Sequence, residues 1–387
     1  MRRRSGEIPE RFLRLDMFWS RETAVILFLA VITGVGAGLG AVVFVQAIAL
    51  LSNLSFEGGV QALGFLGRAC VIILPALGGL MVGLILHFLA PHASRRGIPE
   101  VLAAMAERNG HLRPVVVLSQ ALGSMITIGT GGSVGQEGPV VQIGSQLGST
   151  LATIFKLDED WVIHLAASGA AGGIAALFGA PLAGTAFALE VVLGDIALET
   201  FPTILVSSIT ASIVSRAVLG ESPAFALPTF QFESLWELIL YLGLGVTAGL
   251  GAIAMIKALE FVENAFDTAK LPTFVKPAVG GFALGVLGFF VPQVLGVGFN
   301  FIERILTGDF TFAVLFMLFV GKLLATSLAL GSGSPGGVMA PALFLGAALG
   351  YAYGEIARSI LPDIMVSSSA YSIIGLTALF AAAARAP

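Results

Sequence analysis

The sequence is poor in charged side chains. Only 11% of its 387 residues are Asp, Glu, Lys or Arg, whereas 56% are hydrophobic and the mean hydropathy is +0.94. A soluble domain carries about a quarter charged residues. The composition therefore indicates an integral membrane protein, and we expect the lipid bilayer, and no nucleic acid, among its partners.

Cysteine and histidine are scarce as well. The single cysteine, Cys70, excludes an intramolecular disulfide and a cysteine metal cluster. The four histidines have no second histidine or carboxylate at ligand spacing, so we expect no metal site and no cofactor, and we interpret His164 as an ordinary helix residue. An enzyme would need a nucleophile with its base or a metal set, and the sequence offers neither at a recognisable spacing. We therefore predict that the protein is not an enzyme.

Long apolar blocks divide the chain into two halves. At ~20 residues per span they predict about ten or more membrane segments, of which several are too short or too rich in glycine to cross. The blocks lie at 24–52, 70–90, 115–128, 162–193, 201–219, 235–256, 277–299, 310–330, 338–361 and 372–384. We place a first membrane repeat at 24–220, a polar linker at 221–234 and a second repeat at 235–387.

The segment 1–23 carries six arginines and four acidic residues and lacks an apolar core. It is typical of an amphipathic lead-in that lies at the membrane surface, and not of a signal peptide. By the positive-inside rule this end is expected on the cytoplasmic side. The sequence thus predicts a multi-pass protein of the cell (inner) membrane with a cytoplasmic N-terminus.

One glycine-rich stretch, GTGGSVGQEGPVVQIGSQLG at 129–148, places a lone carboxylate, Glu137, among apolar residues. Pro139 fits the first turn of a helix, where its missing N–H would have had no partner. The start of such a helix carries unpaired N–H donors and partial positive charge, so it attracts an anion, and glycines let that anion approach the backbone. The stretch therefore predicts an anion site beside Glu137.

The same pattern returns in the second half as GSGSPGGVMAPALFLGAALG at 331–350, without a gap. Broken-helix elements at corresponding positions of two halves are the best sequence pointer to a transporter's midplane site. We predict an all-α polytopic membrane protein built from two inverted-topology repeats, whose broken, partly spanning helices meet at a midplane anion site. The helix starts near Pro139 and Pro341 should then lie within ~15 Å of each other, because both must reach one anion through hydrogen bonds of ~3 Å.

A further repeat pairs residues 169–181, which end in FGAP, with 375–387, which end in ARAP. After the first copy the chain continues with LAGTAFALEVV, and after the second copy the given sequence stops. We expect that the natural protein is longer and that the second repeat is incomplete.

Four ordered motifs resemble the signature stretches of the CLC family of chloride channels and proton/chloride antiporters. They are GIPEV at 97–101, GQEGP at 135–139, GVGFN at 296–300 and GGVMAP at 336–341, and their spacing covers nearly the whole chain. The resemblance implies a homodimer with one anion pathway per subunit, and chloride and protons as its substrates. It also implies that Glu137 is the gating glutamate and proton carrier, and that N–H groups around Gln136, Glu137 and Gly138 and at Val338 and Met339 bind the anion.

The chain departs from this family's pattern at several positions. Arg96 stands where the family commonly has the serine that bonds the central anion, so we include Arg96 among the expected anion-binding residues. Gln136 replaces a basic residue, and Met339 replaces a phenylalanine without changing the backbone N–H. The tyrosine that closes the inner side of the family's site, its last helices and any nucleotide-binding tail would follow residue 387.

Glu190 is the second acid expected at membrane depth. A buried acid there is a functional candidate by default, but we favour a structural role in which it caps backbone N–H groups, because buried charges are paired. The family's internal proton-transfer glutamate falls one residue later, at Val191.

Three functions stay open. The first is proton-coupled chloride antiport, and the second is a passive voltage- or pH-gated chloride channel of the same fold, which Val191 favours. The third is a non-transporting membrane protein. We rank them in that order, and the preferred anion is not predicted because selectivity depends on cavity size and field strength.

Overall fold

The computed structural model of the chain describes residues 21–58, 67, 69–91, 95–194, 200–220, 236–308, 310–360 and 367–384. The lead-in proposed at 1–23 falls outside these residues except for its last three, and the linker at 221–234 falls outside them entirely. What is described is helical, apart from short connections.

The helices of the two halves follow the glycine and proline pattern of the sequence. Those of the first half are α1 (Arg21–Asn53), η3 (Leu54–Gly58), α3 (Cys70–Leu89), α4 (Ile98–Glu107), α5 (Pro114–Gly129), α6 (Glu137–Ile154), α7 (Glu159–Phe178), α8 (Pro181–Phe187), η5 (Ala188–Leu193) and α9 (Phe201–Leu219). Those of the second half are α10 (Trp236–Thr268), α11 (Lys276–Phe290), η6 (Pro292–Val294), α12 (Phe299–Thr307), α13 (Phe312–Gly331), α14 (Met339–Ile360) and α15 (Ser368–Ala384).

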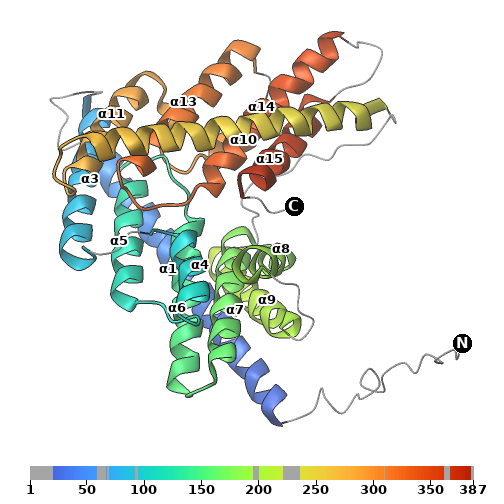
Figure 1. Cartoon of the computed structure of the whole chain (residues 1–387). Helices are drawn as coiled ribbons and strands as arrows, with labels where there is room; N and C mark the ends of the chain where they lie inside the picture. The colour runs from blue at the N-terminus through green and yellow to red at the C-terminus, as the bar shows by residue number, and fades with distance from the viewer. Residues whose placement is uncertain are drawn as a thin grey trace, which may run out of the picture.

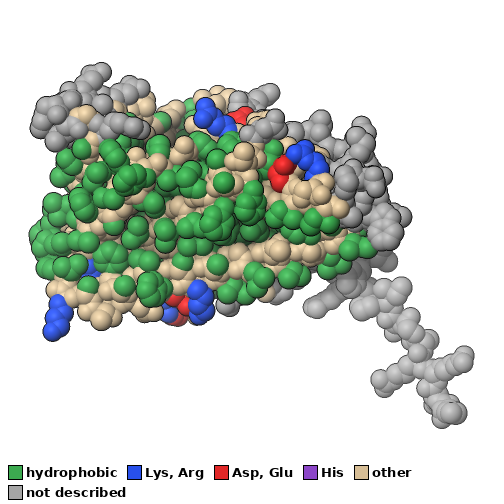
Figure 2. Space-filling view, turned by 90° about the horizontal axis from the view of Figure 1, so that it is seen from above, with side chains coloured by type: hydrophobic (Ala, Val, Ile, Leu, Met, Phe, Trp, Pro, Cys, Tyr) green, Lys and Arg blue, Asp and Glu red, His purple; other side chains and the backbone are tan. Residues whose placement is uncertain are grey.

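Six helices of the described residues are long and apolar enough to cross a membrane, namely those at 23–56, 70–89, 159–178, 201–219, 237–268 and 312–331. Their outer faces carry large apolar side chains in the open, such as Phe88, Phe261 and Phe290, each 75% exposed. Figure 2 shows a broad band of hydrophobic side chains across one face, with Lys, Arg, Asp and Glu towards its upper and lower edges. Such a band fits the hydrocarbon layer of a bilayer.

The two repeats pack against each other with inverted topology. In Figure 1, helices α6 to α9 fill the lower part of the molecule, and α10 and α13 to α15 fill the upper part. Within each repeat a long helix, α1 or α10, packs on the later helices of its own half. The glycine turns that precede α6 and α14 meet in the middle, where Gly135 and Gly337 form an antiparallel bridge.

Small residues set the spacing of the central helices. A Cβ on Gly169 of α7 would overlap the carbonyl of Gly144 on α6, and a Cβ on Gly375 of α15 would overlap the carbonyl of Gly346 on α14. These four glycines are the repeated positions of the sequence. The internal repeat therefore encodes two equivalent close helix contacts, the small-xxx-small packing that membrane helices use.

The structure adds two element boundaries to the sequence pattern. The apolar block at 162–193 contains more than one helix, because α7 ends at Phe178, Gly179 takes the left-handed conformation (φ 65°), and α8 and the π-helix η5 follow. The polar residues at 261–268 are helical, because α10 continues to Thr268.

Candidate functional site

The site forms where two helices begin. Helix α6 starts at Glu137 and α14 starts at Met339, and each carries a proline, Pro139 or Pro341, in its first turn. At that place proline costs no intrahelical hydrogen bond. Both helices therefore present unpaired N–H groups and the positive ends of their dipoles at their starts.

The two starts are brought into direct contact by the glycine turns. The N–H of Gly135 donates to the carbonyl of Gly337 at 2.8 Å, and the N–H of Gly337 donates back to Gly135 at 2.8 Å. The predicted proximity of the two helix starts, within ~15 Å for hydrogen bonds of ~3 Å to one anion, is thus confirmed. Two segments about 200 residues apart in the sequence form one site.

The side chain of Glu137 lies inside this site. It is fully buried, and its Oε1 accepts a hydrogen bond from the N–H of Ala340 in the first turn of α14 at 2.8 Å. Its other oxygen, Oε2, is buried without a hydrogen-bond partner within standard geometry. A Cβ at either Gly135 or Gly337 would collide with the carboxylate. The carboxylate of the first repeat therefore occupies the helix start of the second, where an anion would be bound.

The predicted backbone donors lie at the starts of α6 and α14, where that carboxylate is bound. Gln136 precedes the first residue of α6, Gly138 lies in its first turn, and the N–H groups of Gln136, Glu137 and Met339 also interact with the Glu137 carboxylate. Val338 directly precedes α14. The direct donor, Ala340, was missed by sequence reasoning, although all N–H groups of a first helical turn are free and the residue after Met339 was therefore available.

Arg96 lies in a cavity beside the site. The cavity measures about 330 Å³, and its lining includes Arg96, Gln120, Glu263, Asp267 and Lys276. The guanidinium rests against Gly333 in the second glycine turn. The next residue, Gly97, packs against Gly138 and Gly336. Arg96 is thus placed at the approach to the site, one residue away from its wall, and not at the Glu137 carboxylate.

Two glutamines hold the wall between cavity and site. Gln120 Oε1 accepts from the N–H of Gly97 at 3.0 Å and from Gln142 Nε2 at 2.8 Å, while Gln120 Nε2 donates to the carbonyl of Arg95 at 2.9 Å. Both glutamine side chains are almost fully buried. Sequence reasoning missed them, and the signal was their polarity inside apolar helices, where a buried amide needs partners. They fix the left-handed Gly97, whose φ is 65°.

The prediction that Glu190 is a buried capping carboxylate is wrong. Its side chain is exposed, on the π-helix η5. The neighbouring Val191 is partly buried and packs on a cluster that includes Val101 of α4 and Ala167 of α7. His164 packs edge-on against Trp161, with ring centroids 5.3 Å apart.

Comparisons with known proteins agree with this geometry. A family model described as "Voltage gated chloride channel" matches residues 78–387. The chain belongs to this family. The H(+)/Cl(-) exchange transporter ClcA of Vibrio vulnificus is 36% identical over 378 residues, which cover 94% of this chain and 79% of that protein. The protein of the same name from Vibrio campbellii is 36% identical over 377 residues, with the same coverage.

Solved structures of two antiporters share the fold. A slow cyanobacterial Cl-/H+ antiporter superposes with a TM-score of 0.83 at 25% identity, covering 94% of this chain and 86% of that one. A CLC-type fluoride/proton antiporter superposes with a TM-score of 0.80 at 22% identity, covering 94% and 88%. The predicted all-helical architecture with two inverted repeats is confirmed.

Proposed function

We propose that this protein exchanges chloride for protons across the membrane. One observation carries the proposal: the Glu137 carboxylate, a titratable anion, sits at the start of α14 and accepts the N–H of Ala340. The relatives named H(+)/Cl(-) exchange transporter support the same assignment.

A tethered carboxylate couples the two ions through competition. When ionised, Glu137 fills the place where chloride would bind and is stabilised by the same N–H donors. When it takes up a proton it becomes neutral, loses that stabilisation and leaves the site to chloride. Release of the proton on the other side of the membrane, and return of the carboxylate, then expels the chloride.

The other site residues bind and guide the anion in this scheme. The N–H groups of Gln136, Gly138, Val338 and Met339 hold the dehydrated chloride by helix-start donors. The cation of Arg96 raises the local chloride concentration in the cavity next to the site. Glu137 is the gate and the proton carrier.

The second candidate function is a passive chloride channel of the same fold. It is favoured by Val191, an apolar residue at the position where this family's internal proton-transfer glutamate is expected, and by Glu190, which is exposed beside it. Without an internal proton acceptor, Glu137 would open and close the chloride pathway without net exchange of chloride for protons. We rank this function below antiport.

We further propose that the protein works as a homodimer in the cell (inner) membrane, with residues 1–23 at the cytoplasmic surface. The division into a first repeat at 24–220 and a second at 235–387 belongs to the same proposal. The arginines before α1 support the orientation through the positive-inside rule.

Flux measurements in liposomes test the proposed function. With an outward chloride gradient and no pH gradient, wild-type protein should move protons uphill into the vesicles as chloride leaves. In Glu137→Gln the side chain is neutral and carries no proton, so chloride flux should persist, lose its rise at low pH, and move no protons. Proton pumping that survives in the variant would refute the role of Glu137, and chloride flux without proton movement in the wild type would establish the channel.

A further inference from the structure

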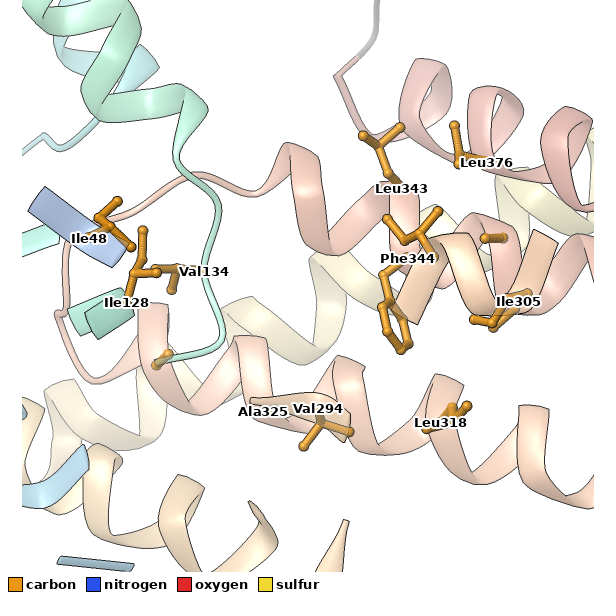
Figure 3. Close-up of a cluster of buried hydrophobic side chains, with 14 of the residues drawn as sticks. Ile48, Ile128, Val134, Val294, Ile305, Leu318, Ala325, Leu343, Phe344 and Leu376 are labelled. Carbon is orange, nitrogen blue, oxygen red and sulfur yellow. The ribbon is translucent and has the colours of Figure 1, made fainter. Parts of the chain in front are cut away.

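One buried cation has no place in the mechanism above. Lys322 lies in the middle of α13, a helix long and apolar enough to cross a membrane, and its side chain is fully buried. Its Nζ donates to the carbonyl of Gly296 at 2.7 Å and to that of Val294 at 3.2 Å, and it lies 5.3 Å from the centre of the Phe344 ring. No acidic side chain of the described residues forms an ion pair with it. Figure 3 shows Phe344 pointing from α14 towards Val294 and α13.

The internal repeat identifies what Lys322 corresponds to. Counted from the matching glycines Gly129 and Gly331, Lys322 occupies the position of Gln120. The hydrogen bonds correspond as well. Gln120 donates to the carbonyl of Arg95, three residues before the start of α4 at Ile98. Lys322 donates to the carbonyl of Gly296, three residues before the start of α12 at Phe299. The partners correspond as well, since Gln142 pairs with Gln120 where Phe344 pairs with Lys322.

The comparison separates two tasks of the lysine. In the first repeat a neutral glutamine ties the loop before the half-helix, so this task needs no charge. A cation at the same place in the second repeat is expensive to bury, and a residue of that kind inside a membrane protein is by default a functional candidate. What the exchange of Gln for Lys adds is a positive charge.

The repeat also shows that the second cation, Arg96, has no charged counterpart in the second repeat. Arg96, in the loop before α4, corresponds to Val297, in the loop before α12. Each of the half-helices α4 and α12 thus has one cation near its start, carried by the preceding loop in the first repeat and by the following helix, α13, in the second. Because the repeats are inverted, these two cations lie on opposite sides of the midplane site.

The loop that Lys322 holds touches the turn that leads to Glu137. The N–H of Gly296 donates to the carbonyl of Gly131 at 3.0 Å, and Thr326, one turn after Lys322, bonds to Ser133 at 3.1 Å. The cation therefore stands behind the glycine turn of the first repeat, on the side of the site away from the Arg96 cavity.

We propose that Lys322 is the anion-attracting charge of the approach opposite the Arg96 cavity, where its buried cation raises the affinity of the pathway for a small anion such as chloride. This inference rests on the proposed anion transport. It goes beyond it in assigning a new residue, and in making the two approaches electrically equivalent although their sequences differ.

The test compares chloride-dependent flux in liposomes for the wild type and three variants. Lys322→Gln keeps a donor for the Gly296 carbonyl, as Gln120 does for Arg95, but removes the charge, and it should raise the half-saturating chloride concentration by about tenfold. Lys322→Arg keeps the charge and should stay within about twofold of the wild type. Lys257→Gln is the control, because Lys257 is an exposed lysine of α10 paired with Glu260.

The outcomes distinguish this inference from the proposed function. If folded Lys322→Gln has the same half-saturating chloride concentration as the wild type, the role of Lys322 is overturned while chloride transport stands. Absence of chloride flux in the wild type would overturn the proposed function and this inference with it.

A double variant provides the test if Lys322→Gln does not fold. The double variant Lys322→Gln, Phe344→Gln reproduces the amide pair that Gln120 and Gln142 form in the first repeat. It restores a satisfied contact without restoring the charge. Its half-saturating chloride concentration should still be raised by about tenfold, and an unchanged value would show that the lysine only ties the loop.

Discussion

At the scale of single residues, the site depends on where charge is placed around one carboxylate. Glu137 supplies the negative charge, and backbone N–H groups supply the opposing partial charges, with no ion pair to a cation of the described residues. Arg96 and Lys322 stand further back on the two sides. Cations held at a distance attract an anion without binding it so tightly that it cannot leave, which is the balance that transport requires.

Arg96 gives a prediction at this scale. Arg96→Ser removes a cation from the cavity, so we expect a rise in the half-saturating chloride concentration of several-fold, measured by flux or by calorimetric chloride binding. Folding should be unaffected, since a substitution on an exposed surface changes stability by about half a kcal/mol or less.

The matched control for Arg96 is its neighbour. Arg95 is exposed and its guanidinium pairs with Glu107 at 2.7 Å, away from the cavity lining. Arg95→Ser should leave chloride affinity as it is. Unaltered binding and transport in Arg96→Ser would mean that this arginine is a solvated loop residue and that only the backbone donors hold the anion on this side.

At the scale of helices, the glycine contacts between α6 and α7 and between α14 and α15 fix how closely the elements approach. Gly169→Ala places a methyl group against the backbone carbonyl of Gly144, which cannot move aside as a side chain would. We expect a loss of about 1–3 kcal/mol, as in other overpacked cores, measured as a lower unfolding midpoint in detergent.

A glycine of α10 provides the comparison for that measurement. A Cβ on Gly249 would meet nothing within 4 Å, so Gly249→Ala should be neutral or stabilising, because alanine is the better helix former. Equal destabilisation by both substitutions would show that the cost is a property of glycine replacement and not of the α6–α7 contact.

The helices also show how far sequence reasoning reaches. The starts of α6 and α14 could be predicted because proline, glycine and a lone acid act locally, through φ and through unpaired N–H groups. Ala340, Gln120 and Lys322 were not predicted as site residues, because their roles depend on contacts between segments far apart in the sequence. The exact place of the break at Gly179 required the structure, because an unbroken apolar run does not distinguish one helix from two.

Glu190 illustrates the same limit through a prediction that was wrong. Its place at the end of a small-residue helix suggested burial, yet the π-helix η5 turns the carboxylate to the surface. A local change in helical winding rotates every later side chain, and composition carries no signal of it. The sequence shows Arg96 as a departure from the family's motif, whereas its position in a cavity required the fold.

At the scale of the whole molecule, the two inverted repeats share one gate, so a substitution in the second repeat should act on the glutamate of the first. A Cβ at Gly337 would meet the Glu137 carboxylate and nothing nearer, and a Cβ at Gly135 would meet the same carboxylate from the other side. Neither glycine has a positive φ, so alanine fits the backbone at both positions.

Gly337→Ala should therefore displace the carboxylate from the start of α14, raise chloride flux at neutral pH and weaken its coupling to protons, in the direction of Glu137→Gln. Because both glycines act on one side chain, the double variant Gly135→Ala, Gly337→Ala should raise flux by less than the product of the single effects.

Gly245→Ala, on α10 with open space around it, is the control and should leave flux and coupling as in the wild type. Independent, multiplying effects of Gly135→Ala and Gly337→Ala would show that each repeat gates its own pathway, contrary to the single site in which the carboxylate of one repeat accepts the N–H of the other.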